Sequence, residues 1–405
     1  MIGNRKPIDI LFAGFIVDDS MFSLIAQNDT TPQYAAHRFQ KSLLSMMSSA
    51  NFLSITAVGS APMSLYPNNK IIYLPAKKWS RSTAVGYVIP TFNLPIIRSL
   101  TRFGAFLSFI ISWALKRRKI RSQKIIFIYA LHTPHLLASY LASKILNITV
   151  VAYIPDLPMY MQANEKLPFI KSILKKLDSK LLLRIVNKID GRVVITENMF
   201  EFIKRDSSMV LDSISLRACG DEVGLQSGKY VLYAGGLNNS NGIKELANSF
   251  LHPKIKSAGL SLVLCGQGPL GEYCSILASE NGNIKYLGLT TNEHVVALQK
   301  KAFALINLRK NEHQYTKYSF PSKIAEYIQS GVPVISTRLL GIPDDLERFL
   351  NYVENDPVEM LLSVNDDYMK YKYLAEEGRE YYLSTRSPEA QAKRFCKYIN
   401  ENFGD

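Results

Sequence analysis

Short apolar segments rich in Val and Ile alternate with longer amphipathic segments along almost the whole chain, and this alternation limits the possible folds most strongly. Strands that alternate with helices build parallel sheets, and nearly continuous hydrophobicity indicates strands covered on both faces. The sequence therefore predicts an α/β protein. The predicted strands are 8–16, 52–58, 71–74, 124–130, 149–154 and 192–195 in the first half, and 230–234, 261–265, 283–287, 303–308 and 332–336 in the second.

The length indicates two domains. A chain of 405 residues exceeds the roughly 250 to 300 residues at which a single core stops growing. The stretch 212–229 is polar and rich in turn residues, so we place the junction there. The predicted domains are 1–215 and 226–385, and the amphipathic end, 386–405, is expected to form a helix that packs back on the first domain.

The charge balance favours anionic partners. Lys and Arg outnumber Asp and Glu by 48 to 34, a formal charge of +14, so the surface attracts phosphates, nucleic acid or acidic lipids. The basic residues show no nucleic-acid recognition motif, and we predict no nucleic-acid partner. The four cysteines have no paired spacing, which argues against a zinc site or a disulfide framework and for a reducing compartment.

The sequence predicts a cytoplasmic protein. Lys6 is followed directly by a strand pattern with an acid inside it, without the small-residue cleavage site of a secretion signal. The longest apolar stretch, 103–115, is shorter than the roughly 20 residues that span a bilayer.

The stretch 319–336 is the most informative motif. Ser319 is suited to cap a helix whose early turn contains Pro321 and whose end is marked by Gly331. The free N–H groups at such a helix start, from Ser319 through Ser322, can hold phosphate. Lys323 and Glu326 follow on one face of this helix. The alternative is an ordinary amphipathic helix with a surface ion pair.

Several glycines follow predicted strands, where a backbone can approach a ligand closely. Gly235 and Gly236 come directly after the strand 230–234, and Gly14 lies near the end of the first strand. Gly266 belongs to a Gly-x-Gly after the strand 261–265, which is weak evidence of nucleotide binding. A turn without a ligand is the alternative at these positions.

Two polar residues follow neighbouring strands of the first domain. His132 comes just after the strand 124–130, and Asp156 comes after the strand 149–154. Open parallel sheets bind ligands at the carboxyl ends of their strands, so we predict that both face the catalytic cleft. A structural histidine and a turn or capping aspartate are the alternatives.

The pattern Pro321-Ser322-Lys323, Glu326-Tyr327 and Gly331-x-Pro333-Val334 resembles the GT-B-fold retaining glycosyltransferases of the group 1, family 4 type, which build bacterial polysaccharides and glycolipids. The resemblance covers nearly the whole chain. It implies two Rossmann-like domains facing across a cleft and transfer of a hexosyl or N-acetylhexosaminyl group from a UDP- or GDP-sugar. It also implies ribose binding by Glu326, diphosphate binding at 319–322, a nucleobase loop at 286–289 and a histidine such as His132 beside the reacting sugar.

The chain departs from this family at three charged positions. Tyr318 stands where the family has a second glutamate, and Gly236 and Asn241 stand where it has an arginine and a lysine. The missing positive charge is expected to come from other basic side chains. The candidates are Arg309, Lys310, Lys317 and Lys323.

We predict no metal and no tightly bound cofactor. Asp18 and Asp19 are adjacent, and the chain has no aspartate-x-aspartate triplet of the kind that metal-dependent transferases use. The helix start and basic side chains would then neutralise the leaving diphosphate.

The basic and apolar segment Arg98 to Arg121 is predicted to bind an anionic membrane surface. Its apolar part, 103–115, ends in a basic cluster, which suits shallow insertion into an acidic leaflet. The alternative is a core helix with a solvated basic end. The acceptor is then expected to be a lipid-linked glycan or an oligosaccharide at the inner face of the plasma membrane, as in O-antigen, capsule or exopolysaccharide synthesis.

Two other functions remain compatible with the sequence. A nucleotide-sugar epimerase on the same fold would bind the same donor without an acceptor. A non-catalytic subunit of a polysaccharide-assembly complex would explain the three departures from the family pattern.

Overall fold

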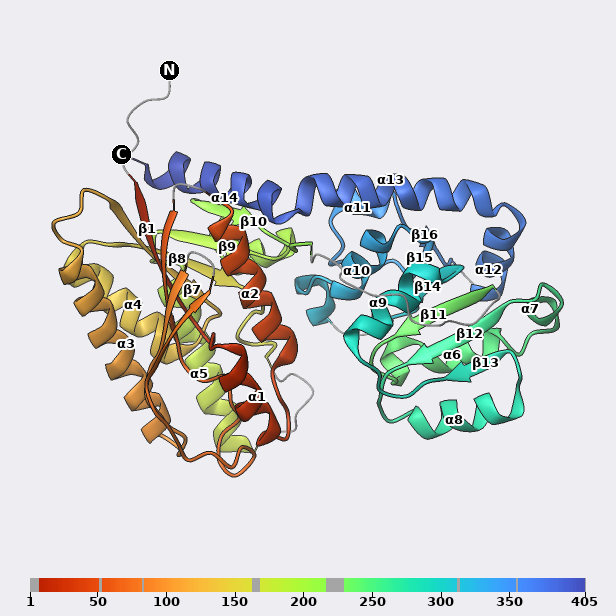
Figure 1. Ribbon diagram of the computed structural model, residues 1–405, viewed down its shortest axis with the longest axis horizontal. Coiled ribbons are helices and arrows are strands. Elements are labelled where there is room, and N and C mark those ends of the chain that lie inside the picture. Colours follow the sequence, from red (N-terminus) through yellow and green to blue (C-terminus); the bar gives the residue numbers. More distant parts are fainter. Residues whose placement is uncertain are drawn as a thin grey trace, which may run out of the picture. The chain divides into compact units, whose positions relative to one another are not determined.

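The computed structural model describes residues 7–50, 53–81, 84–161, 168–215, 229–311, 314–354 and 356–404. The chain divides into two compact units (Figure 1). The first comprises Met1–Ile214 with Pro388–Asp405, and the second comprises Ser215–Ser387. Most of the expected junction, residues 216–228, lies outside the described residues.

The first unit contains an eight-stranded sheet in the order β10-β9-β8-β7-β1-β2-β5-β4. All neighbours are parallel except β4 and β5, which form an antiparallel hairpin. Because β2 lies on one side of β1 and β7 on the other, the strand order reverses between β1 and β7, which makes this the topological switch point. The strands are β1 (Ile8–Gly14), β2 (Leu53–Gly59), β4 (Lys77–Arg81), β5 (Ala84–Val88), β7 (Gln123–Tyr129), β8 (Thr149–Ile154), β9 (Gly191–Val194) and β10 (Ser208–Val210).

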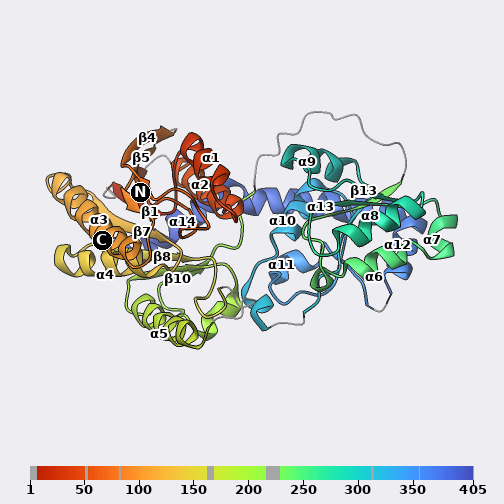
Figure 2. The ribbon, with the colours of Figure 1, turned by 90° about the horizontal axis from the view of Figure 1, so that it is seen from below.

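Helices cover both faces of this sheet (Figures 1 and 2). One layer contains α1 (Asp19–Gln27), α2 (Tyr34–Ser48) and α14 (Pro388–Phe403), and the other contains α3 (Ile97–Lys116), α4 (Thr133–Leu146) and α5 (Phe169–Val186). The last helix is tied to the sheet through Tyr398, whose hydroxyl accepts from the Arg192 N–H at 3.0 Å and donates to the Ser207 carbonyl at 2.7 Å.

The predicted parallel strand at 71–74 is wrong. Only β3 (Tyr73–Leu74) is extended, and it pairs antiparallel with β6 (Thr91–Phe92) in a separate two-stranded sheet. The hairpin of β4 and β5 was not predicted, because its edge strand has a polar sequence in which Lys77, Lys78 and Ser80 are exposed and Trp79 alone reaches the core among the side chains described there. Edge strands of this kind have no continuous apolar signal.

The second unit contains six parallel strands in the order β13-β12-β11-β14-β15-β16. This is the strand order of the doubly wound nucleotide-binding sheets, and the switch point lies between β11 and β14. The strands are β11 (Tyr230–Ala234), β12 (Ser261–Cys265), β13 (Ile284–Tyr286), β14 (Ala304–Asn307), β15 (Val334–Ser336) and β16 (Asn351–Tyr352).

Alternate residues of the central strand build two cores. Val231 and Tyr233 pack with helices on one face, and Tyr230 and Leu232 pack with helices on the other. The first face is covered by α6 (Ile243–Ser249) and α12 (Pro357–Asp366), and the second by α9 (Asn292–Lys301), α10 (Ser322–Ser330) and α13 (Tyr368–Arg386). The remaining helices of this unit are α7 (Pro253–Ser257), α8 (Gly271–Glu280) and α11 (Asp344–Glu347).

One face of the segment predicted to enter a membrane leaflet packs into the core of the first unit. Phe106, Ile110 and Trp113 of α3 are buried, and α3 packs along α4. Arg102 is 3% exposed and donates to the Ala61 carbonyl at 2.8 Å, while Arg98 donates to the Met63 carbonyl at 3.2 Å. These two arginines therefore face inward and do not contribute the predicted membrane contact. None of the described helices combines the length and apolarity needed to span a bilayer.

Candidate active site

Three loops are joined at the carboxyl edge of the second sheet. The Gly235 N–H donates to the Cys265 carbonyl at 2.8 Å, which joins the loops after β11 and β12. The Gly266 N–H donates to the Gly288 carbonyl, also at 2.8 Å, which adds the loop after β13. The predicted glycines thus lie beside the switch point, where such sheets bind ligands.

Two of these positions favour glycine, and at Gly235 the reason is a φ of +155°, which other residues rarely adopt. A Cβ on Gly266, whose φ is +131°, would lie 1.9 Å from the Gly235 carbonyl oxygen. A Cβ on Gly235 would lie 1.7 Å from the Lys323 amine. At the exposed Gly236 the nearest atoms would be 3.5 Å away, which is ordinary contact.

Lys323 crosses the end of the central strand. Its helix, α10, packs on one face of the sheet, yet its amine passes through the space above Gly235 to Tyr233, whose side chain belongs to the other face. The amine donates to the Tyr233 hydroxyl at 2.8 Å and lies 4.5 Å from the ring centroid. Lys323 is therefore mostly buried, which argues against the alternative of an ordinary amphipathic helix with a surface ion pair.

Burial lowers the pKa of Lys323 to about 8. The nearby charge of Glu326 opposes this shift, and the positive charge of Arg309 adds to it. Burial also raises the pKa of Tyr233, which stays a neutral hydrogen-bond partner, and Arg309 acts against that increase. Two of the four candidate cations, Arg309 and Lys323, thus converge on Tyr233.

The other two candidate cations have different neighbours. Lys310 forms a 2.5 Å ion pair with Glu245 on α6. The Lys317 amine lies 4.8 Å from the ring centroid of the buried Tyr318, which stands in place of the family's second glutamate. Asn241, in place of the expected lysine, donates to the Gly236 carbonyl at 2.7 Å, so it stabilises the glycine loop by hydrogen bonding.

The prediction that Ser319 caps the helix is wrong. Helix α10 begins at Ser322 with Pro321 at the N-cap position, and the side chain of Pro321 makes no capping hydrogen bond. Ser319 instead follows the short 3₁₀ helix Gln314–Tyr318, and its N–H donates to the Thr316 carbonyl. Phe320 precedes a proline and is therefore disfavoured in helical conformation, which delays the helix start until after Pro321.

Gly14 is the last residue of β1 and His132 follows β7, so both lie at the switch point of the first unit. A Cβ on Gly14 would lie 2.5 Å from the Gln40 Oε1 atom, which accepts from the Phe15 N–H at 2.8 Å. His132 occupies the N-cap position of α4, and its buried Nδ1 finds no hydrogen-bond partner among the described residues. Burial and the charges of Arg102 and Arg98 lower the pKa of His132 to about 3, so the ring is neutral.

A second histidine beside His132 was not predicted. His135 is fully buried, and its Nε2 lies 3.1 Å from the Ser60 hydroxyl. Its ring packs between Phe15 and Phe106, with centroids 4.6 and 4.0 Å away. The sequence does hold a signal for this pair, because two histidines three residues apart at the start of a helix lie on the same face of that helix.

Asp156 follows β8, the neighbour of β7, so it shares the carboxyl edge with His132. Its side chain is exposed at the surface, and the surrounding protein raises the pKa of its carboxyl by desolvation.

Comparison with known proteins matches the second unit to a known protein family. Residues 228–364, which include all six strands and α10, match the family described as glycosyl transferases group 1. The chain carries a group 1 glycosyltransferase domain. The predicted enzyme class, glycosyltransferase, is thereby confirmed. No curated protein sequence matches the chain.

Solved structures similar to this glycosyltransferase cover both units. Sucrose-phosphate synthase from Thermosynechococcus elongatus is 14% identical, with a TM-score of 0.63 over 98% of this chain and 99% of that one. HepE from Anabaena in complex with UDP is 12% identical, with a TM-score of 0.60 over 97% and 100%. WaaG, a glycosyltransferase involved in lipopolysaccharide biosynthesis, is 11% identical, with a TM-score of 0.55 over 95% and 99%. The predicted α/β fold of the GT-B type is confirmed.

Proposed function

We propose that this glycosyltransferase takes its sugar from a nucleotide-diphosphate donor bound at the switch point of the second unit. Lys323 and Arg309 would neutralise the diphosphate, together with the start of α10 and the backbone at Gly235 and Gly236. Glu326 would bind the ribose, as the resemblance implies. The observation that carries the proposal is the Lys323 amine, which is mostly buried at the carboxyl end of the central strand.

The state of Lys323 explains why an anion suits this place. A desolvated ammonium group is unfavourable, and its lowered pKa records that penalty. A phosphate oxygen beside the amine would favour the charged form and restore the pKa. The same two cations would stabilise the leaving diphosphate without a metal ion.

For the acceptor, we propose the carboxyl edge of the first unit. The neutral His132 ring would orient a sugar hydroxyl, and Asp156 would accept a hydrogen bond from the acceptor. As the resemblance implies, the bond between the anomeric carbon and the diphosphate breaks while the acceptor oxygen bonds to that carbon on the same face. The acceptor proton passes to the departing phosphate oxygen.

We further propose a UDP-linked hexose or N-acetylhexosamine as donor and a membrane-associated glycan or lipid-linked sugar as acceptor. HepE was solved with UDP, and WaaG acts in lipopolysaccharide biosynthesis, which supports this choice for a chain of similar fold. The net charge of +14 favours an anionic membrane surface, which we place at the inner face of the plasma membrane.

Thermal stabilisation by UDP- and GDP-sugars tests the donor site, because a ligand that binds only the folded state raises its apparent stability. We expect a UDP-sugar to stabilise the protein and Glu326→Ala to abolish the effect. Glu280→Ala, at an exposed glutamate at the end of α8, is the matched control. An unchanged shift in Glu326→Ala would show that the donor binds elsewhere.

Product analysis separates the two other functions. An epimerase would convert the donor without any acceptor, and a non-catalytic subunit would bind the donor without transferring sugar.

A further inference from the structure

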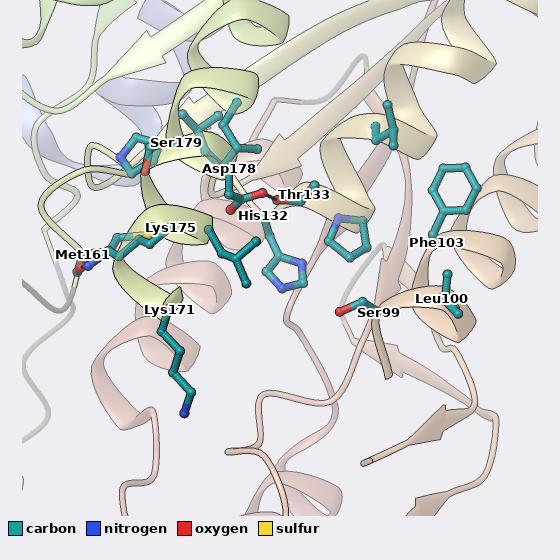
Figure 3. Close-up of a pocket in the computed structure, with 16 residues that line it drawn as sticks. Ser99, Leu100, Phe103, His132, Thr133, Met161, Lys171, Lys175, Asp178 and Ser179 are labelled. Carbon is teal, nitrogen blue, oxygen red and sulfur yellow. Dashed lines mark hydrogen bonds between the residues drawn. The ribbon is translucent and has the colours of Figure 1, made fainter. Parts of the chain in front are cut away.

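The first unit contains a cavity of about 840 Å³ between the starts of three helices (Figure 3). This volume falls within the roughly 300 to 1,000 Å³ that is usual for small-molecule pockets. Most of its wall is apolar, and the polar His132 lies at the same cavity. The apolar side chains are Leu100 and Phe103 from α3, Leu137 from α4, Leu174 and Leu182 from α5, with Leu131, Pro134, Pro158 and Met161 from the connecting segments and the helix start.

The topology places this cavity at the carboxyl edge of the sheet. Helix α4 follows β7 directly and therefore starts at that edge. Helices α3 and α5 each precede a parallel strand, β7 and β9, so they begin at the same edge and run back across the sheet. The cavity is thus adjacent to the proposed acceptor residue His132.

The first turns of α3 and α5 expose large apolar side chains around the cavity. Phe169 is 80% exposed and Ile170 is 71% exposed on α5, and Ile96 is 78% exposed before α3. Leu100 and Leu174, which line the cavity, are also exposed. An apolar surface of this kind marks a site where a protein partner or a membrane binds.

The charge on α5 decides between these two occupants. The helix carries five basic side chains and a single acidic one, Asp178, whose carboxylate accepts from the Thr133 hydroxyl at 2.5 Å. The Lys171 side chain extends away from the helix beside the cavity (Figure 3). Each Lys or Arg near an anionic bilayer contributes roughly 1 kcal/mol of attraction, so the excess of basic side chains on α5 favours a membrane over a protein partner. The basic residues are Lys171, Lys175, Lys176, Lys180 and Arg184.

We infer that this cavity binds the hydrocarbon chain of a lipid phosphate and that the first turns of α5 dock on the bilayer that supplies it. The inference rests on the proposed function, because it assigns the lipid of the acceptor to a site beside His132. Lys171 contacts the phosphate, and the apolar wall contacts the chain. This location differs from the buried middle of α3, where the sequence predicted membrane insertion.

Calorimetric binding of farnesyl phosphate to the full-length protein tests the cavity. We expect binding to the unaltered protein and at least about tenfold weaker binding to Leu174→Asp, because a carboxylate then faces the chain. Ile145→Asp is the matched control, since Ile145 is 69% exposed on the last turn of α4 and lies outside the cavity. Equal binding to Leu174→Asp and the unaltered protein, or no binding at all, would overturn the assignment.

The head group is tested with farnesol, which lacks the phosphate. Farnesol should bind more weakly than farnesyl phosphate, and Lys171→Ala should remove most of this difference. If the difference persists in Lys171→Ala, Lys171 is not the phosphate contact.

Docking is tested by sedimentation with vesicles of phosphatidylglycerol and phosphatidylcholine. Ile170→Asp should lose most of the binding, while Ile145→Asp keeps it. Failure of the unaltered protein to bind these vesicles would overturn docking and assign the apolar surface to a protein partner. Donor-induced thermal stabilisation is measured on the same samples, and it should persist in Leu174→Asp. Its absence in every sample would refute the proposed function, whereas donor stabilisation without lipid-phosphate binding would refute only the present inference.

Discussion

A glycine lies at the end of each central strand, as the last residue of β1 and as the residue after β11, and a group from a neighbouring helix occupies the space beside each glycine. At Gly14 the group is the Gln40 carboxamide, 2.5 Å from the position of a Cβ, and at Gly235 it is the Lys323 amine, 1.7 Å from that position. The carboxamide is neutral and satisfies the Phe15 backbone. The amine is a cation beside a loop that a ligand can approach. The carboxyl ends of the two central strands are thus built for different chemistry.

Burial lowers the pKa of a basic side chain at both sites, but the charge that this side chain carries at pH 7 differs. It lowers the pKa of His132 to about 3, so this side chain is neutral throughout the physiological range. It lowers the pKa of Lys323 to about 8, which leaves most of the lysine charged at pH 7. The first switch point therefore suits a sugar hydroxyl, and the second suits a phosphate.

The largest expected effect comes from removing the cation. Lys323→Met keeps the length of the side chain but has no charge for the leaving diphosphate. We expect sugar transfer to fall by about 10² to 10³, the usual loss when one electrostatic contact to a transition state is removed. The comparison fails if Gln40→Met, the corresponding change in the first unit, reduces donor binding as much as Lys323→Met does.

A smaller effect is expected from the glycine that makes room for the amine. Gly235→Ala must displace Lys323, so the affinity for UDP should fall by about tenfold, measured by calorimetry. Gly282→Ala is the control, because a Cβ there meets no atom within 4 Å. Unchanged UDP affinity in Gly235→Ala would mean that the position of the amine is unimportant.

Lys323→Met should also stabilise the ligand-free protein by roughly 2 kcal/mol at pH 7. Relief of the desolvation penalty exceeds the hydrogen bond lost to Tyr233, which contributes about 1 kcal/mol. Because the unfolded lysine binds its proton more tightly, the penalty is present below pH 8 and disappears as pH rises toward 10.5. Chemical denaturation of both proteins at pH 7 and pH 10 should show the difference shrinking. Lower stability of the variant at pH 7 would contradict this account.

The smallest effect concerns the first unit. Since His132 is already neutral, the rate of transfer should show no step near pH 6.5, where an ordinary histidine titrates. The measurement is the pH profile of kcat/KM. A step near pH 6.5 that disappears in His132→Gln would show that the histidine is charged in the working enzyme.

The strands and their order of appearance could largely be predicted from the sequence, because buried parallel strands are continuously apolar. The edge hairpin could not, since Lys77, Lys78 and Ser80 face solvent. The glycines after β11 and the importance of Lys323 were also accessible from the sequence. The path of the lysine across the strand end was not, because it depends on the packing of α10 and on the empty space at Gly235.

The helix start and the membrane segment are two features for which a local sequence pattern gave a wrong prediction. A local rule placed the cap at Ser319, but the restriction on the residue before Pro321 moved the start to Ser322. The basic residues Arg98 and Arg102 resembled surface cations in the sequence, and tertiary packing directs them inward.

The pH dependence of UDP-sugar binding tests the central claim most directly, because the diphosphate of a UDP-sugar does not titrate between pH 6 and 9. If the mostly buried Lys323 neutralises this diphosphate, the affinity measured by calorimetry should be constant from about pH 6 to 7 and fall as the pH rises through 8, where the free protein loses the charge. Lys323→Met should bind weakly and without this dependence. A pH-independent affinity in the unaltered protein, or the same decline in Lys323→Met, would contradict the account.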